Sequence, residues 1–192
     1  MGGSAKIVAP RDVQILLTML ADRRLGLRDT AILLLSFKAG LRACEIAGLD
    51  WSMVTTPSGS VADCIAIDRL IAKNGRARRV PLHPTLRAAL TALRRQAGKP
   101  RAGPVIESQR GGHLTAGSVV NWFNEAYASV GLSGCSSHSG RRTFITNSAR
   151  MVAKVGGCLR DVQELAGHSA LTTTERYIEG DREAQRKLVR LL

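Results

Sequence analysis

The stretch AGHSALTTTERYIEG, near the end of the chain, places a histidine and a tyrosine nine positions apart. Tyr177 is one of only two tyrosines, and a phenol held among cationic groups is a credible nucleophile toward a phosphate. A tyrosine in a helical segment is more often a packed residue with its hydroxyl at the surface. His168 and Tyr177 therefore indicate phosphate chemistry only if the rest of the chain supplies the other groups that such chemistry requires.

A second pair of residues, in the stretch SSHSGRRTF, has the spacing of an anion site. His138 and Arg141 are three positions apart, so a helix that begins at Ser139 carries both on one face of its first turn. Helix N-termini present free backbone amides and a partial positive charge, and a guanidinium can bind a phosphate through two parallel hydrogen bonds. A capped surface helix with unrelated charges is the alternative that this short motif leaves open.

An arginine and a glutamate lie at a predicted helix junction in AGLRACEIAGLDW. Gly40 is placed to end one helix in a left-handed cap, and Arg42 then begins the next. Glu45, three positions later, could hold Arg42 in place by an ion pair on the same face. In isolation, this pair is equally consistent with a purely structural role.

A lysine precedes a predicted tight turn in IAKNGRARRVPLH. The Asn-Gly pair marks the turn, so Lys73 stands at the tip of a hairpin with Arg76, Arg78 and Arg79 close behind it. A flexible ammonium on a projecting turn can reach into a DNA groove and donate a proton. A solvated, charged hairpin is the alternative.

The elements that must position these groups are mostly helical. Helices are predicted at 11–22, 28–38, from about 42, after Pro84, and at 116–130, 139–153, 159–166, 171–178 and 181–191. Between them, the segments WSMVTT, CIAIDRL and RARRVPL are short and partly alternating, which predicts a small three-stranded antiparallel sheet. A further short extended piece is expected at VIES. The predicted fold class is therefore α+β, mainly helical.

The charge of the chain indicates a polyanionic partner. Its 28 Lys and Arg residues oppose 15 Asp and Glu, which gives a net charge of +13 and favours nucleic acid, or a generic basic protein such as a ribosome-associated one. The four scattered cysteines lack zinc-site spacing and are typical of thiols in a reducing cytosol. No apolar run approaches the ~20 residues that span a bilayer, and no signal-peptide pattern opens the chain, so we expect a cytoplasmic protein without a membrane partner.

Taken in order, these motifs resemble the catalytic domain of the tyrosine recombinases, the family of phage integrases and chromosome-dimer-resolving recombinases. The resemblance runs from about residue 10 to the end and implies a bacterial, phage or mobile-element origin. Six positions filled in the right order make coincidence a poor explanation. The matching motifs are GLRxxE with Arg42, a hairpin lysine at Lys73 followed by RxVPL, HxxR with His138 and Arg141, and GHSxxxTTxxY with His168 and Tyr177.

The resemblance implies a DNA breaking and rejoining enzyme that needs neither a metal nor a cofactor. Tyr177 would attack the scissile phosphate and form a 3′-phosphotyrosine, in integration, excision or inversion. Arg42 and Arg141 would bind the nonbridging oxygens, with a further hydrogen bond from His168.

Proton transfers and DNA contacts are implied in the same way. His138 would help to accept the tyrosine proton, and Lys73 would protonate the departing 5′ oxygen. Glu45 would give structural support. The implied DNA-binding residues are Arg76, Arg78, Arg79 and Arg142.

Three features depart from the pattern of the family. Gly140 stands where a leucine is more frequent, and Arg142 stands where a second histidine is frequent. The stretch that contains RMVAKVGGC is longer than usual, which predicts a longer helix or an extra turn before Cys158. None of these departures removes a catalytic group.

The expected organisation is a flexible N-terminus at 1–9 followed by one catalytic domain at 10–192. Most relatives carry an additional N-terminal core-binding domain, which clamps DNA from the opposite side and is absent from this sequence. The chain is then either an excised catalytic domain or a naturally short member such as the fimbrial-switch invertases. A lone half-clamp is expected to bind DNA weakly and with a strong dependence on salt.

The expected partners are double-stranded DNA and further copies of the chain. Leu188, Leu191 and Leu192 form one helical stripe, and in the family a terminal helix docks onto a neighbouring protomer, which favours a homo-oligomer, a tetramer, on DNA. Docking onto its own core, as a monomer when free, is the alternative. A type IB topoisomerase and a non-catalytic DNA-binding regulator are competing functions. The TTxxY ending and the filled reactive positions favour the recombinase.

Overall fold

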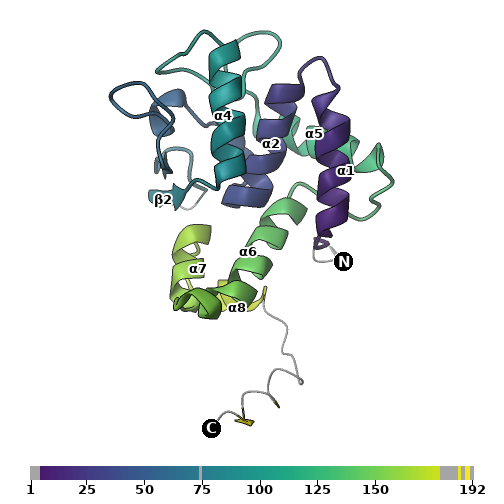
Figure 1. Cartoon of the computed structure of the whole chain (residues 1–192), viewed down its shortest axis with the longest axis vertical. Coiled ribbons are helices and arrows are strands. Elements are labelled where there is room, and N and C mark those ends of the chain that lie inside the picture. Colours follow the sequence, from purple (N-terminus) through teal and green to yellow (C-terminus); the bar gives the residue numbers. More distant parts are fainter. Residues whose placement is uncertain (1–4, 74, 178–185, 187–188, 191–192) are drawn as a thin grey trace.

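The apolar helix α2 (Gly26–Ala39) is the central element of the computed structural model, which describes residues 5–73, 75–177, 186, 189 and 190. Its run AILLLSF is buried on every side, because a helix that is apolar all round is stable only when other elements cover it. Three further long helices pack against it: α1 (Pro10–Ala21), α4 (Pro84–Gln96) and α6 (Ser139–Met151) (Figure 1).

The remaining helices are α3 (Ala43–Ala47), α5 (Ala116–Ala128), the 3-10 turn η2 (Val152–Val155), α7 (Leu159–Ala166) and α8 (Leu171–Glu175). Helix α5 packs on α3, whereas α7 packs on both α6 and α8. Helix α6 therefore links the group around α2 to the α7–α8 pair (Figure 1).

The predicted helices at 11–22, 28–38, 116–130, 139–153 and 159–166 are confirmed to within two residues at each end. The extra turn predicted before Cys158 is η2. The helix predicted at 171–178 ends earlier, at Glu175. The helix predicted at 181–191 lies outside the described residues except for 186, 189 and 190.

The sheet has two strands, where three were predicted. Strand β1 (Cys64–Ile67) pairs antiparallel with β2 (Arg78–Pro81), and the buried side chains of Ile65 and Val80 stand opposite each other. The extended piece predicted at VIES contributes a single bridge, through Glu107.

The predicted first strand, WSMVTT, is wrong because a local turn replaces it. The 3-10 helix η1 (Trp51–Met53) begins this stretch. The Asp50 carboxylate accepts hydrogen bonds from the backbone N–H of Ser52 at 2.8 Å and from its hydroxyl at 2.7 Å. Such a side-chain bond to the nearby backbone stabilises a turn in competition with a strand.

Two glycines set the approach of α6 to α2. Gly40 ends α2 in the predicted left-handed conformation, with φ 63°, which favours a residue without a Cβ. Gly140 lies in the first turn of α6, where an added Cβ would fall within 2.8 Å of the Phe37 ring and closer still to the Ser36 hydroxyl. The leucine that is frequent at position 140 in the family would therefore collide with α2.

The residues just before α1 are packed against α6. Val8 is 3% exposed, and its backbone N–H donates to the Thr143 hydroxyl at 2.9 Å. Lys6 Nζ donates to the Ser133 carbonyl, also at 2.9 Å. The part of the predicted flexible N-terminus that the structure describes is therefore anchored.

A buried carboxylate joins the sheet to the helices. Glu45 in α3 is fully buried and accepts hydrogen bonds from both Nη atoms of Arg78 at 2.8 Å and from Arg42 Nη1 at 3.1 Å. Arg78 also donates from Nε to the Leu165 carbonyl in α7, at 3.1 Å. Burial raises the pKa of Glu45, but the hydrogen bonds and charges of Arg78 and Arg42 outweigh it and hold the pKa below its ordinary value of 4.5.

We expect Gly140→Ala to destabilise the protein by about 1–3 kcal/mol, because overpacking forces α6 away from α2. Urea unfolding followed by circular dichroism measures the change. Gly117→Ala in α5 is the matched control: its added Cβ meets only the Thr115 hydroxyl, at 3.7 Å. It should stabilise the helix by roughly 0.5–1 kcal/mol. Equal stability of Gly140→Ala and the wild type would contradict the close approach.

We expect Glu45→Gln to cost about 3–5 kcal/mol at neutral pH, because it leaves the buried Arg78 charge without its partner. A carboxyl with a depressed folded pKa stabilises the fold above its unfolded pKa, and this stabilisation is lost as the pH falls through the folded value. The wild type should therefore lose stability below pH 4.5, and the difference from Glu45→Gln should narrow.

Thermal unfolding of the two proteins across this pH range checks the expectation. Asp63→Asn is the control, because Asp63 is 90% exposed in its pair with Arg87, and its loss should change stability by no more than about 1 kcal/mol. A difference between Glu45→Gln and the wild type that stays constant with pH would contradict the assignment.

Candidate active site

The predicted catalytic residues come from five segments that meet where α2, α6 and α7 approach one another. His138 is exposed at the start of α6, and partial burial of its ring and then the charges of Lys73, Arg141 and Arg42 lower its pKa, so these cations lie near the imidazole. Arg42 precedes α3, Lys73 follows β1, His138 and Arg141 stand at the start of α6, His168 follows α7, and Tyr177 follows α8.

Arg141 lies at the centre of this cluster and is only 3% exposed. Its Nη1 donates to the Gly40 carbonyl at the end of α2, and its Nη2 donates to the Ala166 carbonyl at the end of α7, at 2.6 Å. Helix C-termini carry partial negative charge, which favours a cation there. Burial and then the charge of Arg42 lower the pKa of Arg141 to about 10, so it stays protonated at neutral pH.

Arg141 also determines the tautomer of His168. Nη2 of Arg141 is 3.1 Å from His168 Nε2, and a guanidinium can only donate, so Nε2 is the unprotonated nitrogen. Nδ1 then carries the proton and donates to the Thr174 hydroxyl at 3.0 Å. Burial and then the charges of Arg141, Arg42 and Arg78 lower the pKa of His168 to about 4. His168 is thus neutral, and direct donation from Nε2 to a phosphate would require this contact to break.

Tyr177 is held against His168. The two rings stack with their centroids 5.6 Å apart and an angle of 21° between their planes. The guanidinium carbon of Arg142 lies 5.7 Å from the Tyr177 ring centroid, a cation–π arrangement. The tyrosine carbonyl accepts a hydrogen bond from the Thr146 hydroxyl of α6, at 3.2 Å. The candidate nucleophile therefore lies within the cationic cluster rather than apart from it.

The four predicted DNA-binding arginines have different surroundings. Arg76 and Arg79 are exposed, and Arg79 donates to the Cys64 sulfur from Nη2 at 2.9 Å. Arg142 contacts Tyr177 as described. Arg78 is engaged by Glu45 and by the Leu165 carbonyl, so its three nitrogens bind protein acceptors. We therefore assign Arg78 a supporting role in place of the predicted DNA contact.

The structure adds three groups that the sequence did not reveal as part of the site. They are the hydroxyl of Thr174 and the backbone carbonyls of Gly40 and Ala166. Thr174 lies within the TTxxY motif, and this position is the only feature of the sequence that could have indicated its place in the site. Backbone carbonyls carry no signal in residue type. Gly40 was predicted only as a helix end.

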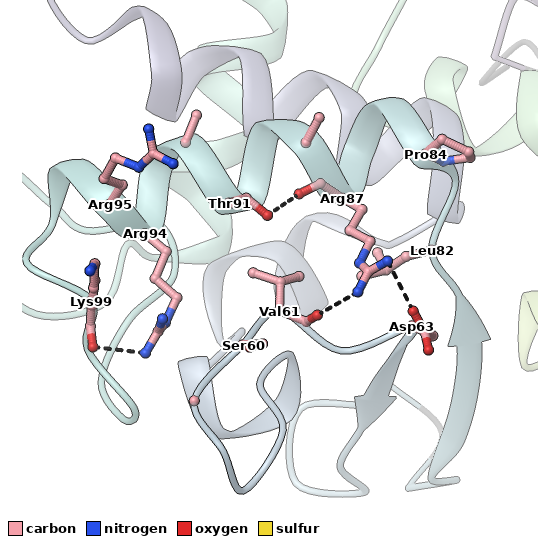
Figure 2. A pocket seen from close by; sticks show the side chains of 13 residues that line it. Ser60, Val61, Asp63, Leu82, Pro84, Arg87, Thr91, Arg94, Arg95 and Lys99 are labelled. Carbon is pink, nitrogen blue, oxygen red and sulfur yellow. Dashed lines mark hydrogen bonds and ion pairs between the residues drawn. The ribbon is translucent and has the colours of Figure 1, made fainter.

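A cavity of about 950 Å³ lies along α4 and is lined by none of the predicted catalytic residues (Figure 2). Its arginines hold loops onto α4: Arg87 Nη1 pairs with Asp63 at 3.2 Å, and Arg94 Nη2 donates to the Lys99 carbonyl at 2.8 Å. Among the described residues, no group of three or more His, Cys, Asp or Glu could hold a metal ion. No helix in that part is long and apolar enough to cross a membrane.

Comparison with known sequences identifies the relatives of the chain. The sequence profile of the phage integrase family matches residues 6–183. Tyrosine recombinase XerC of Rhodospirillum centenum is 32% identical over 162 residues, which cover 83% of this chain and 44% of the relative. Tyrosine recombinase XerC of Xylella fastidiosa is 32% identical over 161 residues, covering 83% and 51%. The chain thus spans about half the length of the relatives it matches.

Solved structures show the same fold at lower identity. The XerA recombinase superposes with a TM-score of 0.73 at 19% identity, over 98% of this chain and 64% of that one. The Tn1549 transposon integrase, solved with circular intermediate DNA, superposes with a TM-score of 0.76 at 17% identity, over 97% and 65%. The mainly helical α+β fold is therefore that of the tyrosine-recombinase catalytic domain. With the sequence match over residues 6–183, this chain belongs to the phage integrase family.

Proposed function

We propose that this chain is the catalytic domain of a site-specific recombinase that cuts and rejoins duplex DNA through a 3′-phosphotyrosine. The stacking of Tyr177 on His168, which is itself hydrogen-bonded to Arg141, is the observation that carries the proposal. It holds a phenol beside the cationic donors that attack on a phosphate requires. The net charge of +13 favours DNA as the partner.

In the cleavage step, Tyr177 Oη forms a bond to the scissile phosphorus, and the bond from phosphorus to the 5′ oxygen breaks. Attack builds negative charge on the nonbridging oxygens, which Arg42 and Arg141 stabilise. A guanidinium has five N–H groups, and three of those on Arg141 bind the acceptors described above. Among the described residues, its Nε and the second N–H of Nη1 have no acceptor, so they are available to a phosphate oxygen.

Two protons move during cleavage. His138 accepts the phenol proton, and burial together with the nearby cations favours the neutral imidazole that this requires. Lys73, exposed on the turn after β1, donates a proton to the departing 5′ oxygen. His168 acts in this scheme by positioning Arg141 and Tyr177.

Rejoining reverses these transfers. The 5′-hydroxyl of a partner strand attacks the phosphotyrosine, the bond from phosphorus to Tyr177 Oη breaks, and the phenol recovers its proton. The number of phosphodiester bonds is conserved, so the reaction needs no energy source. Exchange between duplexes further requires several copies of the chain on DNA, and we propose a tetramer.

A pooled library of nicked duplexes of varied sequence, which trap the covalent intermediate, tests the proposal whichever target site the protein cuts. We expect a protein–DNA adduct that survives denaturant and is absent with Tyr177→Phe. Tyr127→Phe, which alters the other tyrosine, is the matched control and should retain the adduct. An adduct that persists in Tyr177→Phe would refute the assigned nucleophile, whereas the absence of any adduct with the wild type would count against the catalytic function and favour a DNA-binding regulator. Relaxation of a supercoiled plasmid without strand exchange would instead indicate a topoisomerase-like activity.

Arg42→Ala should lower the rate of adduct formation about 10²–10³-fold, because a donor to the developing charge is lost. It should remain folded, since Glu45 keeps its two hydrogen bonds from Arg78. Arg141→Ala is a poorer test, because Arg141 also joins the ends of α2 and α7. Single-turnover kinetics with circular dichroism check the result. A folded Arg42→Ala protein with wild-type kinetics would remove Arg42 from the catalytic set.

A further inference from the structure

A second basic pocket, of about 480 Å³, lies between β2 and α7 and shares His168 with the candidate active site. Besides Arg78, which Glu45 neutralises, it is lined by three arginines and one glutamate, Glu164. The pocket therefore has a surplus of positive charge and suits an anion. The three arginines are Arg76, Arg79 and Arg160.

One buried group in this pocket lacks a partner. Gln163 is 7% exposed, and its Nε2 donates to the His168 carbonyl at 3.1 Å, which fixes the orientation of the amide. Its Oε1 is buried and has no hydrogen-bond donor among the described residues. Leaving a buried acceptor unpaired is unfavourable, and guanidinium N–H groups are the strong donors that line the same pocket.

Arg160 is the arginine best able to supply that donor. Its side chain is 70% exposed, and its contact with Glu164, at 3.7 Å from Nε to Oε1, is a long surface ion pair that restrains it only weakly. Arg79, by contrast, already donates to the Cys64 sulfur. If Arg160 turns into the pocket, Gln163 Oε1 can accept one of its N–H groups, while its other N–H groups remain free to bind a phosphate.

We propose that this pocket binds a backbone phosphate of the cleaved DNA strand, close to the phosphate attacked by Tyr177, through Arg160 braced by Gln163 and assisted by Arg76. The inference rests on the proposed function, because DNA is the ligand in both. Phosphates of one strand follow each other about every 3.4 Å along the helix axis, so a strand that reaches His168 presents further phosphates to a pocket that shares this residue.

The salt dependence of DNA binding tests the proposal. Fluorescence anisotropy with a short labelled duplex is measured over a series of NaCl concentrations, in a Tyr177→Phe background. Each lost phosphate contact lowers the slope of log K against log salt by about 0.9. We expect this reduction in Arg160→Gln, and no reduction in Arg95→Gln, an equally charged change at an exposed arginine of α4 that does not line this pocket. An unchanged slope in Arg160→Gln, or equal reductions in both variants, would overturn the proposal.

Gln163→Met tests the bracing, since it keeps the size of the side chain and removes the Oε1 acceptor, together with the Nε2 donor to the His168 carbonyl. The slope of log K against log salt should fall in Gln163→Met as it does in Arg160→Gln, and it should fall no further in the variant that carries both changes. Additive reductions in the double variant would show that Gln163 does not act through Arg160. In a separate arm, inorganic phosphate is added in thermal unfolding. If phosphate stabilises the wild type but not Arg160→Gln, while the salt slope of DNA binding is the same in both, the pocket binds free anions. That result would overturn the assignment to DNA.

The two proposals can fail independently. The salt slope of DNA binding is measured in the Tyr177→Phe background, which cannot form the phosphotyrosine. Adduct formation is measured separately on the wild type, in which Arg160 is unchanged. A normal adduct with an unchanged slope would therefore refute the pocket alone. A reduced slope without any adduct would refute the catalytic function and retain DNA binding.

Discussion

The buried guanidinium of Arg141 is the constraint on which the rest of the structure depends. Burying a cation is costly unless acceptors surround it, and here they are the carbonyls that end α2 and α7, together with His168. Those carbonyls can meet one guanidinium only if α6 approaches α2 closely. The left-handed turn at Gly40 and the bare Cα of Gly140 allow that approach. The packing of α6 against α2 therefore also fixes the position of Arg141, the candidate catalytic cation.

A consequence of this arrangement is a site whose imidazoles are neutral. Burial and the nearby charges of Arg141, Arg42 and Arg78 lower the pKa of His168, and within the described part of the chain Glu45 is the one carboxylate that pairs with any of these arginines, Arg42 and Arg78. A neutral His168 can accept from Arg141 on one nitrogen while donating to Thr174 on the other. The same electrostatics favour a neutral His138, the form that can take a proton.

What the sequence could predict was local. The apolar run of α2, the bounds of α7 and the cap at Gly40 each depend on residues within a few positions of one another. The strand at WSMVTT was predicted wrongly because the Asp50–Ser52 turn competes with extended backbone. The role of Arg78 was missed because its partner Glu45 is 33 positions away, and an arginine in a charged hairpin resembles a solvated one. The order and spacing of the motifs could indicate which residues belong to the candidate site, but they could not show which arginines point into the protein.

The exposure of the cluster limits how a substrate can reach it. Arg141 and His168 are 3% and 6% exposed, whereas Lys73 is exposed and the Arg42 side chain retains 13%. A phosphate bound as proposed would therefore meet the more exposed Lys73 and Arg42 before it meets Arg141. Its negative charge would reduce the repulsion from Arg42 and Arg78 that now lowers the pKa of Arg141. The attraction that we propose for a phosphate thus has the same origin as the crowding of these arginines, whose charge Glu45 balances in part through its pairs with Arg42 and Arg78.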